Sequence, residues 1–309
     1  MTSTAVFVVV ISTGCNYDIS QASANANNTY KQTGSDITNK QNEEQQKTME
    51  QYQTLLENNA SLIEIAKFID SNVSQVSSDN AVEMIDEFEK RQKEFLPKLE
   101  GKFVENPDIQ SKMVEAFLLD FDLNKLNSIE DEKVQELLKE TKESGFKVET
   151  AEGMFFPVIN YEFYKRYSNF VTNDFKEYIN IMTVESNNTP AKDAALVISW
   201  TEILNRTLNQ EKFIAQYPDS KRMDNVKGLY KKYLTFTLFG LNNTPLFGYD
   251  SNEMDKDAKQ AFIEVLKTNS DNSDYLTILS DYMSLVEENS YKLTDAVKKY
   301  RDGVIEKLD

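Results

Sequence analysis

This 309-residue chain contains no histidine, so acid–base catalysis would have to use carboxylates. The absence of histidine excludes Ser-His-Asp and Cys-His nucleophile systems, histidine-ligated zinc and pH switching by imidazole. The one cysteine, Cys15, excludes a disulfide within the chain and cysteine clusters for metals. Paired carboxylates about 5–10 Å apart could still hydrolyse glycosidic bonds. A carboxylate-dependent hydrolase is therefore one alternative to be tested.

Four oxygen-bearing residues have part of the spacing of a calcium-binding EF-hand loop. Asp120, Asp122 and Asn124 match its first odd positions, and Asp131 stands at its twelfth. The loop requires glycine at its sixth position, where this chain has Lys125, and a bidentate glutamate at its twelfth. These residues are better explained as an acidic helix end. We therefore expect no metal and no other cofactor.

Glu202 and Arg206 form another charged pair of interest, one helical turn apart and close to Trp200. Side chains at this spacing are neighbours on a helix surface and usually form a solvated salt bridge. We therefore expect a surface ion pair at this position and no active site.

Aromatic residues concentrate in residues 155–182 and 230–249 and could line a ligand-binding cleft. The candidates lie at predicted ends of elements, where grooves form, and they are Phe155, Phe156, Tyr161, Tyr164, Phe247 and Tyr249. Rings at such positions would suit stacking on sugars or on the peptide of a partner. The competing interpretation places these rings in the hydrophobic core, where large apolar side chains are usually buried.

The first fifteen residues carry the clearest targeting pattern in the chain. An apolar run from Ala5 to Ile11 is followed by the small residues Thr13 and Gly14 and then by Cys15. This arrangement resembles the signal peptide and lipobox of bacterial lipoproteins. The resemblance implies that residues 1–14 are removed, that Cys15 carries fatty acyl chains such as palmitate, and that the protein is extracellular, on the outer face of the bacterial cell membrane.

Lipidation at Cys15 would attach the chain to the membrane without a transmembrane helix. Spanning a bilayer takes about 20 apolar residues, and no stretch after Cys15 approaches that length. Stable anchoring takes about two acyl chains, which a diacylglyceryl group supplies. Residues 15–48 are rich in Asn, Gln, Ser and Thr, and such a polar segment cannot bury enough apolar surface to fold. We therefore expect a disordered, lipidated tether over residues 15–48.

The charge of the chain limits its partners. Lys and Arg number 34 and Asp and Glu number 51, which gives a formal net charge of −17. Nucleic acid binding requires clustered cations, so nucleic acid is not expected as a partner. The expected partners are the membrane, through the lipid anchor, and an envelope protein or a component of the cell wall.

Apolar residues recur at steps of three and four from Met49 onward, which predicts a series of helices. Pro97 should kink or divide one of them. Ser128, with Asp131 three residues later, predicts the start of a short helix near Ile129. Residues 49–144 are thus predicted to form an N-terminal helical bundle.

The period changes to two after Gly145. Residues 146–150 and 154–159 predict a β-hairpin, and Pro157 would confine the second strand to an edge. Helices resume at Tyr161, and Thr189 followed by Pro190 predicts another helix start. The loop over residues 240–249 and this hairpin are the expected recognition surfaces.

Together these patterns predict an all-α fold, either a multi-helix bundle or an array of helical hairpins, with one small β-hairpin near residues 146–159. The predicted segments are a signal peptide (1–14), a lipidated tether (15–48), an N-terminal bundle (49–144) and a C-terminal helical domain (145–309). The predicted function is that of a membrane-anchored lipoprotein, a non-enzymatic interaction or structural protein of the cell envelope. The alternatives are a carboxylate-dependent cell-wall hydrolase and an extracytoplasmic ligand-binding protein.

Overall fold

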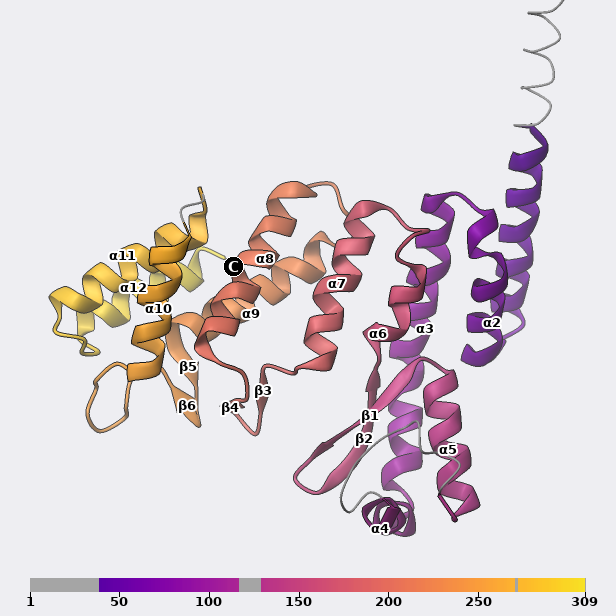
Figure 1. Ribbon diagram of the computed structural model, residues 1–309, viewed down its shortest axis with the longest axis horizontal. Coiled ribbons are helices and arrows are strands. Elements are labelled where there is room, and N and C mark those ends of the chain that lie inside the picture. The colour runs from indigo at the N-terminus through magenta and orange to yellow at the C-terminus, as the bar shows by residue number, and fades with distance from the viewer. Residues whose placement is uncertain (1–38, 117–128, 270–271, 309) are drawn as a thin grey trace, which may run out of the picture. The chain divides into compact units, whose positions relative to one another are not determined.

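The computed structural model describes residues 39–116, 129–269 and 272–308, and helices dominate these residues (Figure 1). The predicted all-α class with a small β-hairpin near residues 146–159 is confirmed. Two further hairpins of two-residue strands are also present. Cys15 and the apolar run before it lie outside the described residues, as do the three calcium-like oxygen ligands in residues 120–124.

The chain groups by its contacts into residues 1–51 and residues 52–309. Residues 39–57 are helical, so regular structure begins before residue 48, the predicted limit of the tether. The segment is polar, but it is rich in Gln, Glu and Lys, which are good helix formers. Low hydrophobicity alone therefore placed the end of the predicted tether too late in the chain.

The second unit contains the remaining elements, which Figure 1 labels in chain order. They are α2 (Leu62–Asn72), α3 (Ser78–Val104), α4 (Pro107–Ala116), α5 (Glu132–Glu143), β1 (Phe146–Ala151), β2 (Met154–Ile159), α6 (Tyr161–Tyr164), α7 (Asn173–Asn187), β3 (Ala191–Lys192), β4 (Ala195–Leu196), α8 (Trp200–Gln216), α9 (Met223–Phe239), β5 (Gly240–Leu241), β6 (Thr244–Pro245), α10 (Lys256–Thr268), α11 (Asp274–Glu288) and α12 (Asp295–Glu306), with 3₁₀ turns at Val73–Gln75 and Lys165–Tyr167.

Helix starts in this unit follow side-chain capping. Ser61 and Glu64 form a capping box at the start of α2, in which each side chain accepts a hydrogen bond from the other residue's backbone N–H. Asp131 is the N-cap of α5 and accepts from the N–H groups of Lys133 and Val134. The helix therefore begins at Glu132, a few residues after the predicted start near Ile129.

The two proline predictions have different outcomes. α3 continues through Pro97 as one helix, so Pro97 does not divide it, and the helix packs on α2 and β2. The predicted helix start at Pro190 is replaced by the β3–β4 hairpin, which turns at Asp193 and Ala194 with φ of 45° and 52°. α8 starts after Ser199, whose side chain accepts from the N–H of Glu202.

The predicted hairpin pairs β1 with β2 in antiparallel register, from Phe146 opposite Ile159 to Ala151 opposite Met154. Its turn consists of Glu152 and Gly153, both with positive φ, as a two-residue hairpin turn requires. Gln110 of α4 bonds to β2 like a third strand, since its side chain accepts from the N–H of Phe155 at 2.9 Å and donates to the carbonyl of the same residue at 2.8 Å. Gln110 thus provides hydrogen-bond partners for the backbone of Phe155 at the edge of β2.

The β1–β2 hairpin packs on α3 and on α5. Residues before and after the predicted boundary at 144/145 therefore belong to one packed region. Contacts group all of residues 52–309 into a single compact unit.

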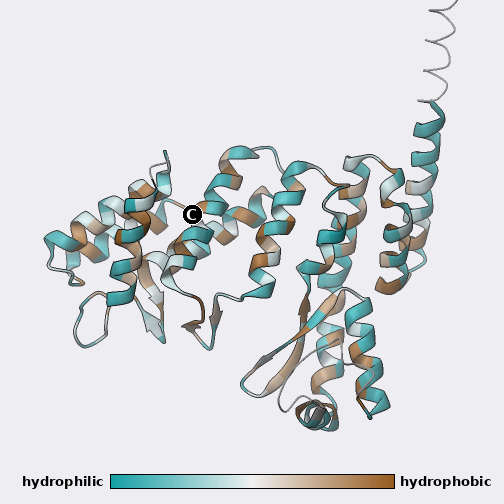
Figure 2. Cartoon of the chain, viewed as in Figure 1, coloured by the Kyte–Doolittle hydropathy of each residue, from teal (hydrophilic) through white to brown (hydrophobic). Residues whose placement is uncertain are grey.

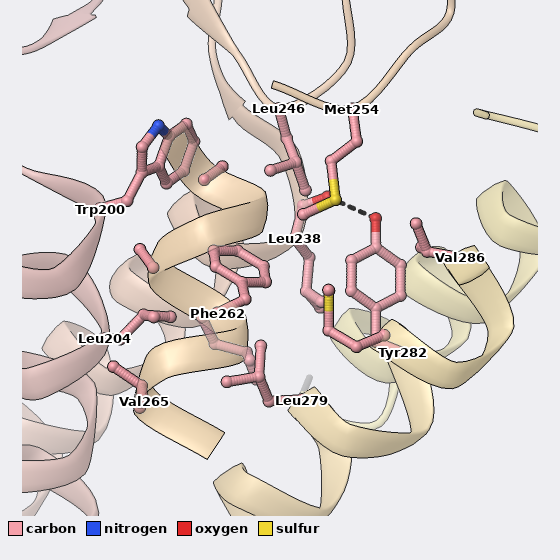
Figure 3. Packing of buried hydrophobic residues seen from close by; sticks show 14 of the residues in the cluster. Trp200, Leu204, Leu238, Leu246, Met254, Phe262, Val265, Leu279, Tyr282 and Val286 are labelled. Carbon is pink, nitrogen blue, oxygen red and sulfur yellow. Dashed lines mark hydrogen bonds between the residues drawn. The ribbon is translucent and has the colours of Figure 1, made fainter. Parts of the chain in front are cut away.

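The C-terminal helices α8 to α12 surround a hydrophobic core (Figure 3). Phe262, Leu279 and Tyr282 are buried in it, and the Tyr282 hydroxyl donates to the carbonyl of Leu238 at 3.2 Å. Trp200, at the start of α8, packs edge-on against Phe262. This core holds α8, one of the two helices that form the candidate site.

Hydrophobic and hydrophilic residues alternate along every helix coloured in Figure 2, which is the pattern of helices that bury one face. Among the described residues, no helix combines the length and the apolar character needed to cross a bilayer.

Candidate functional site

Four of the six aromatic residues singled out from the sequence lie in the core. Phe155, Tyr161, Tyr164 and Phe247 are buried, Phe156 is half-buried, and Tyr249 is 71% exposed. Tyr161 stacks on Tyr164 with ring centroids 5.3 Å apart, and the rings of this pair also contact Phe88, Phe163 and Tyr178. These rings stabilise the packing of α6 on α3 and α7.

A groove between α7 and α8 has the geometry of a ligand site. Its volume is about 310 Å³, at the lower end of the range for small-molecule pockets. α7 contributes Glu177, Asn180, Ile181, Val184 and Glu185, and α8 with the residue after it contributes Arg206, Asn209, Gln210, Lys212, Phe213, Gln216 and Tyr217.

Arg206 forms the charged floor of this groove and is only 4% exposed. Its Nε donates to Glu202 at 2.8 Å, and its Nη1 lies 3.2 Å from Glu185 and 3.0 Å from the Tyr233 hydroxyl. Nη1 also donates to the backbone carbonyl of Asn188. Its Nη2 is buried and has no hydrogen-bond partner among the described residues.

Gln210 lies one helical turn after Arg206 and is 1% exposed. Its Oε1 is also buried and lacks a hydrogen-bond partner among the described residues. A buried polar atom without a partner costs about 1–3 kcal/mol, and native proteins contain few of them. Two such atoms, one donor and one acceptor, therefore belong to side chains that line the same groove on successive turns of α8.

The electrostatics of the floor fix the protonation states of its groups. Burial acts to lower the pKa of Arg206, but its hydrogen bond to Glu202 and the neighbouring Tyr233 and Glu185 outweigh burial and raise the pKa. Burial, together with the charge of Glu185, raises the pKa of Tyr233. Arg206 is therefore a permanent cation and Tyr233 a permanent hydrogen-bond donor at physiological pH.

The walls of the groove combine amides with apolar surface. Asn180 is half-buried, while Asn209 and Gln216 are exposed at the rim. Phe213 and Tyr217 pack together at one end with ring centroids 5.2 Å apart. The groove thus offers hydrogen-bonding groups of both kinds beside an aromatic surface.

A second buried charge cluster holds α7 in place. Glu89 of α3 is 1% exposed, accepts from the hydroxyls of Tyr161 and Tyr178 at 2.6 and 2.9 Å, and pairs with Lys93 and Arg222. Burial alone would raise the pKa of Glu89, but Arg222, Lys93 and Tyr161 outweigh it and lower the pKa. Because Tyr178 is on α7, this cluster positions one wall of the groove relative to α3.

Sequence reasoning identified the Glu202–Arg206 pair but expected it to be solvated, and it did not identify Glu185 or Gln210. A signal for the burial of Arg206 was present, since it lies at helical spacing from the apolar Ile203 and Phe213. The sequence around Glu185, the partner of Arg206 on α7, contains no local pattern that predicts this contact.

Among the residues that the structure describes, no group of three or more cysteine, aspartate and glutamate side chains could hold a metal ion. The carboxylates of the groove floor contact Arg206 instead. Comparison with protein-family models, with curated proteins and with solved structures gives no match.

Proposed function

We propose that this chain is a lipid-anchored, non-enzymatic binding protein of the bacterial cell envelope, and that the groove between α7 and α8 is its ligand site. The observation that carries the binding proposal is the pair of buried, unpartnered atoms, Arg206 Nη2 and Gln210 Oε1, on two side chains that line one groove. A ligand that hydrogen-bonds to both atoms would remove the cost of leaving them unpaired. The apolar run and Cys15 at the start of the sequence support the anchor.

The floor of the groove favours binding over catalysis. A general acid or base must exchange a proton near the working pH. Arg206 and Tyr233 keep their protons, and Glu185 and Glu202 are both engaged by the guanidinium of Arg206. These carboxylates hold a cation in place, which does not favour the alternative of a carboxylate-dependent cell-wall hydrolase at this site.

The anchor is tested by growing cells with an alkyne analogue of palmitate and comparing the wild-type chain with the Cys15→Ser variant. We expect label on the wild type and none on the variant, because Cys15 is the only thiol in the chain. Asn16→Ser is a matched control and should keep the label. Equal labelling of the wild type and Cys15→Ser, or an unlabelled wild type, would contradict the anchor.

The binding site is tested separately in solution, with the full chain carrying Cys15→Ser as the unlipidated reference. Ligand-observed NMR is measured against neutral sugars, amino acids and small carboxylates. We expect at least one class to bind the reference chain and to bind less well after Gln210→Leu. A reference chain that binds none of the three classes would overturn the proposed site.

A further inference from the structure

We infer that the ligand of the α7/α8 groove is a neutral, polyhydroxylated molecule, a carbohydrate of one or two rings. This inference rests on the proposed binding function and concerns only the chemical class of the ligand. Three properties of the groove support it: its charge balance, its hydrogen-bonding atoms and its aromatic end.

The charges at the groove are nearly balanced. Glu177 and Glu185 face Lys212 and Arg206, and Glu202 beside Arg206 adds one further carboxylate. Arg206 is moreover held between Glu185 and Glu202 at 3.2 and 2.8 Å, which compensates its charge from within the protein. An anionic ligand at Nη2 would lie close to Glu185, and a cationic ligand would lie close to the guanidinium. A neutral ligand avoids both repulsions.

To pair both buried atoms, a ligand must supply one acceptor and one donor. Arg206 Nη2 can only donate a hydrogen bond, and Gln210 Oε1 can only accept one. A hydroxyl group has both capacities, so neighbouring hydroxyls of a sugar can accept from Nη2 and donate to Oε1. The side-chain amides of Asn180, Asn209 and Gln216 also donate and accept, which extends the same chemistry to the rim.

The end of the groove supplies an apolar surface for the C–H face of a sugar ring. The half-buried Tyr217 provides the accessible ring, and Phe213, which is 3% exposed, packs against it with the two rings tilted by 56°. Ile181 and Val184 add aliphatic surface from α7. The volume of about 310 Å³ limits the ligand to a small molecule.

The test uses the full chain with Cys15→Ser and titrates it with glucose, galactose, N-acetylglucosamine and cellobiose as neutral sugars. Glycine and glutamate represent amino acids, and acetate and citrate represent carboxylates. We expect a sugar to give the tightest binding, with Kd raised about tenfold or more by Gln210→Leu because a hydrogen bond to a buried group is lost. Tyr217→Ala should also weaken binding, through loss of the apolar face.

Asn205→Ala is the matched control, because Asn205 is exposed on α8 and does not line the groove. It should leave Kd unchanged. Binding of amino acids or carboxylates in preference to sugars, with loss on Gln210→Leu, would overturn the carbohydrate assignment and keep the binding site. Sugar binding that survives Gln210→Leu and Tyr217→Ala would place the sugar elsewhere and overturn the assignment. Binding of no probe at all would overturn both the assignment and the proposed function.

Discussion

The guanidinium of Arg206 on α8 reaches Glu185 on α7, with Nη1 and Oε1 3.2 Å apart and both side chains at most 10% exposed. This ion pair joins the two helices at the floor of the groove. Arg206 therefore both stabilises the groove and carries the unpartnered Nη2.

Removing one partner of this pair should destabilise the protein strongly. Arg206→Leu leaves the buried carboxylate of Glu185 without its cation, although the Tyr233 hydroxyl still donates to it, and we expect the free energy of unfolding to fall by about 3 kcal/mol. The double variant Arg206→Leu/Glu185→Leu should lose less than the sum of the two single variants, because it leaves no uncompensated charge in the pair. Urea unfolding of the four chains measures this coupling. Additive losses would show that the two residues do not interact.

Gln210→Leu should preserve or raise stability, because the Oε1 that it removes has no hydrogen-bond partner in the protein. Gln92→Leu is the matched control. Gln92 is fully buried, accepts from the Tyr164 hydroxyl and donates to the carbonyl of Ser144 at 2.7 Å. We expect Gln92→Leu to cost about 1–3 kcal/mol. Equal costs for the two variants in thermal or urea unfolding would mean that Gln210 is satisfied within the protein.

Most of the fold could be predicted from the sequence because its helices and its first hairpin are determined locally. The helical period and the alternation around Gly153 both predicted elements that the structure contains. Thr189 followed by Pro190 has the sequence pattern of a helix start, but the N-cap of α8 is Ser199, ten residues later. Local signals cannot distinguish two candidate caps when only one of them precedes a helix with a core to pack on.

The candidate site could be predicted only in part. The spacing of Glu202 and Arg206 predicted their ion pair, which the structure confirms at 2.8 Å. Its burial, and the roles of Glu185 and Gln210, depend on how α7 packs beside α8. That packing depends on contacts between residues that are distant in sequence, such as the bond from Arg206 to Glu185, 21 positions apart.

Acid should destabilise the protein through Glu89. Its pKa in the folded state lies below the ordinary value of 4.5, so its carboxylate contributes stability above that pH and loses it as the pH falls through the folded pKa. Glu89→Gln should lower the free energy of unfolding at pH 7. It should also reduce the slope of that free energy against pH in acid, by up to about 1.4 kcal/mol per pH unit for the one proton removed. Urea midpoints from pH 7 to pH 3 measure both effects. An unchanged slope between pH 7 and pH 3 would exclude Glu89 as a source of the pH dependence.

Two glycines should respond oppositely to alanine. Gly240 ends α9 with φ of 72°, and an added Cβ would lie 2.4 Å from the carbonyl oxygen of Thr244. Gly240→Ala should therefore lower the free energy of unfolding by more than about 1 kcal/mol. Gly303 is inside α12 with open space around it, so Gly303→Ala should raise stability by about 0.5–1 kcal/mol. Thermal unfolding distinguishes these outcomes, and a tolerated Gly240→Ala would show that the β5–β6 hairpin can shift.

In the proposed function, Arg206 Nη2 and Gln210 Oε1 are unpaired within the protein and form hydrogen bonds to a ligand. A crystal structure of the full chain with Cys15→Ser, grown with the tightest-binding sugar, tests it most directly. We predict a sugar between α7 and α8 with hydroxyl oxygens within hydrogen-bond distance of both atoms. A sugar bound elsewhere, or an Nη2 and an Oε1 that are both hydrogen-bonded to protein groups, would contradict the claim.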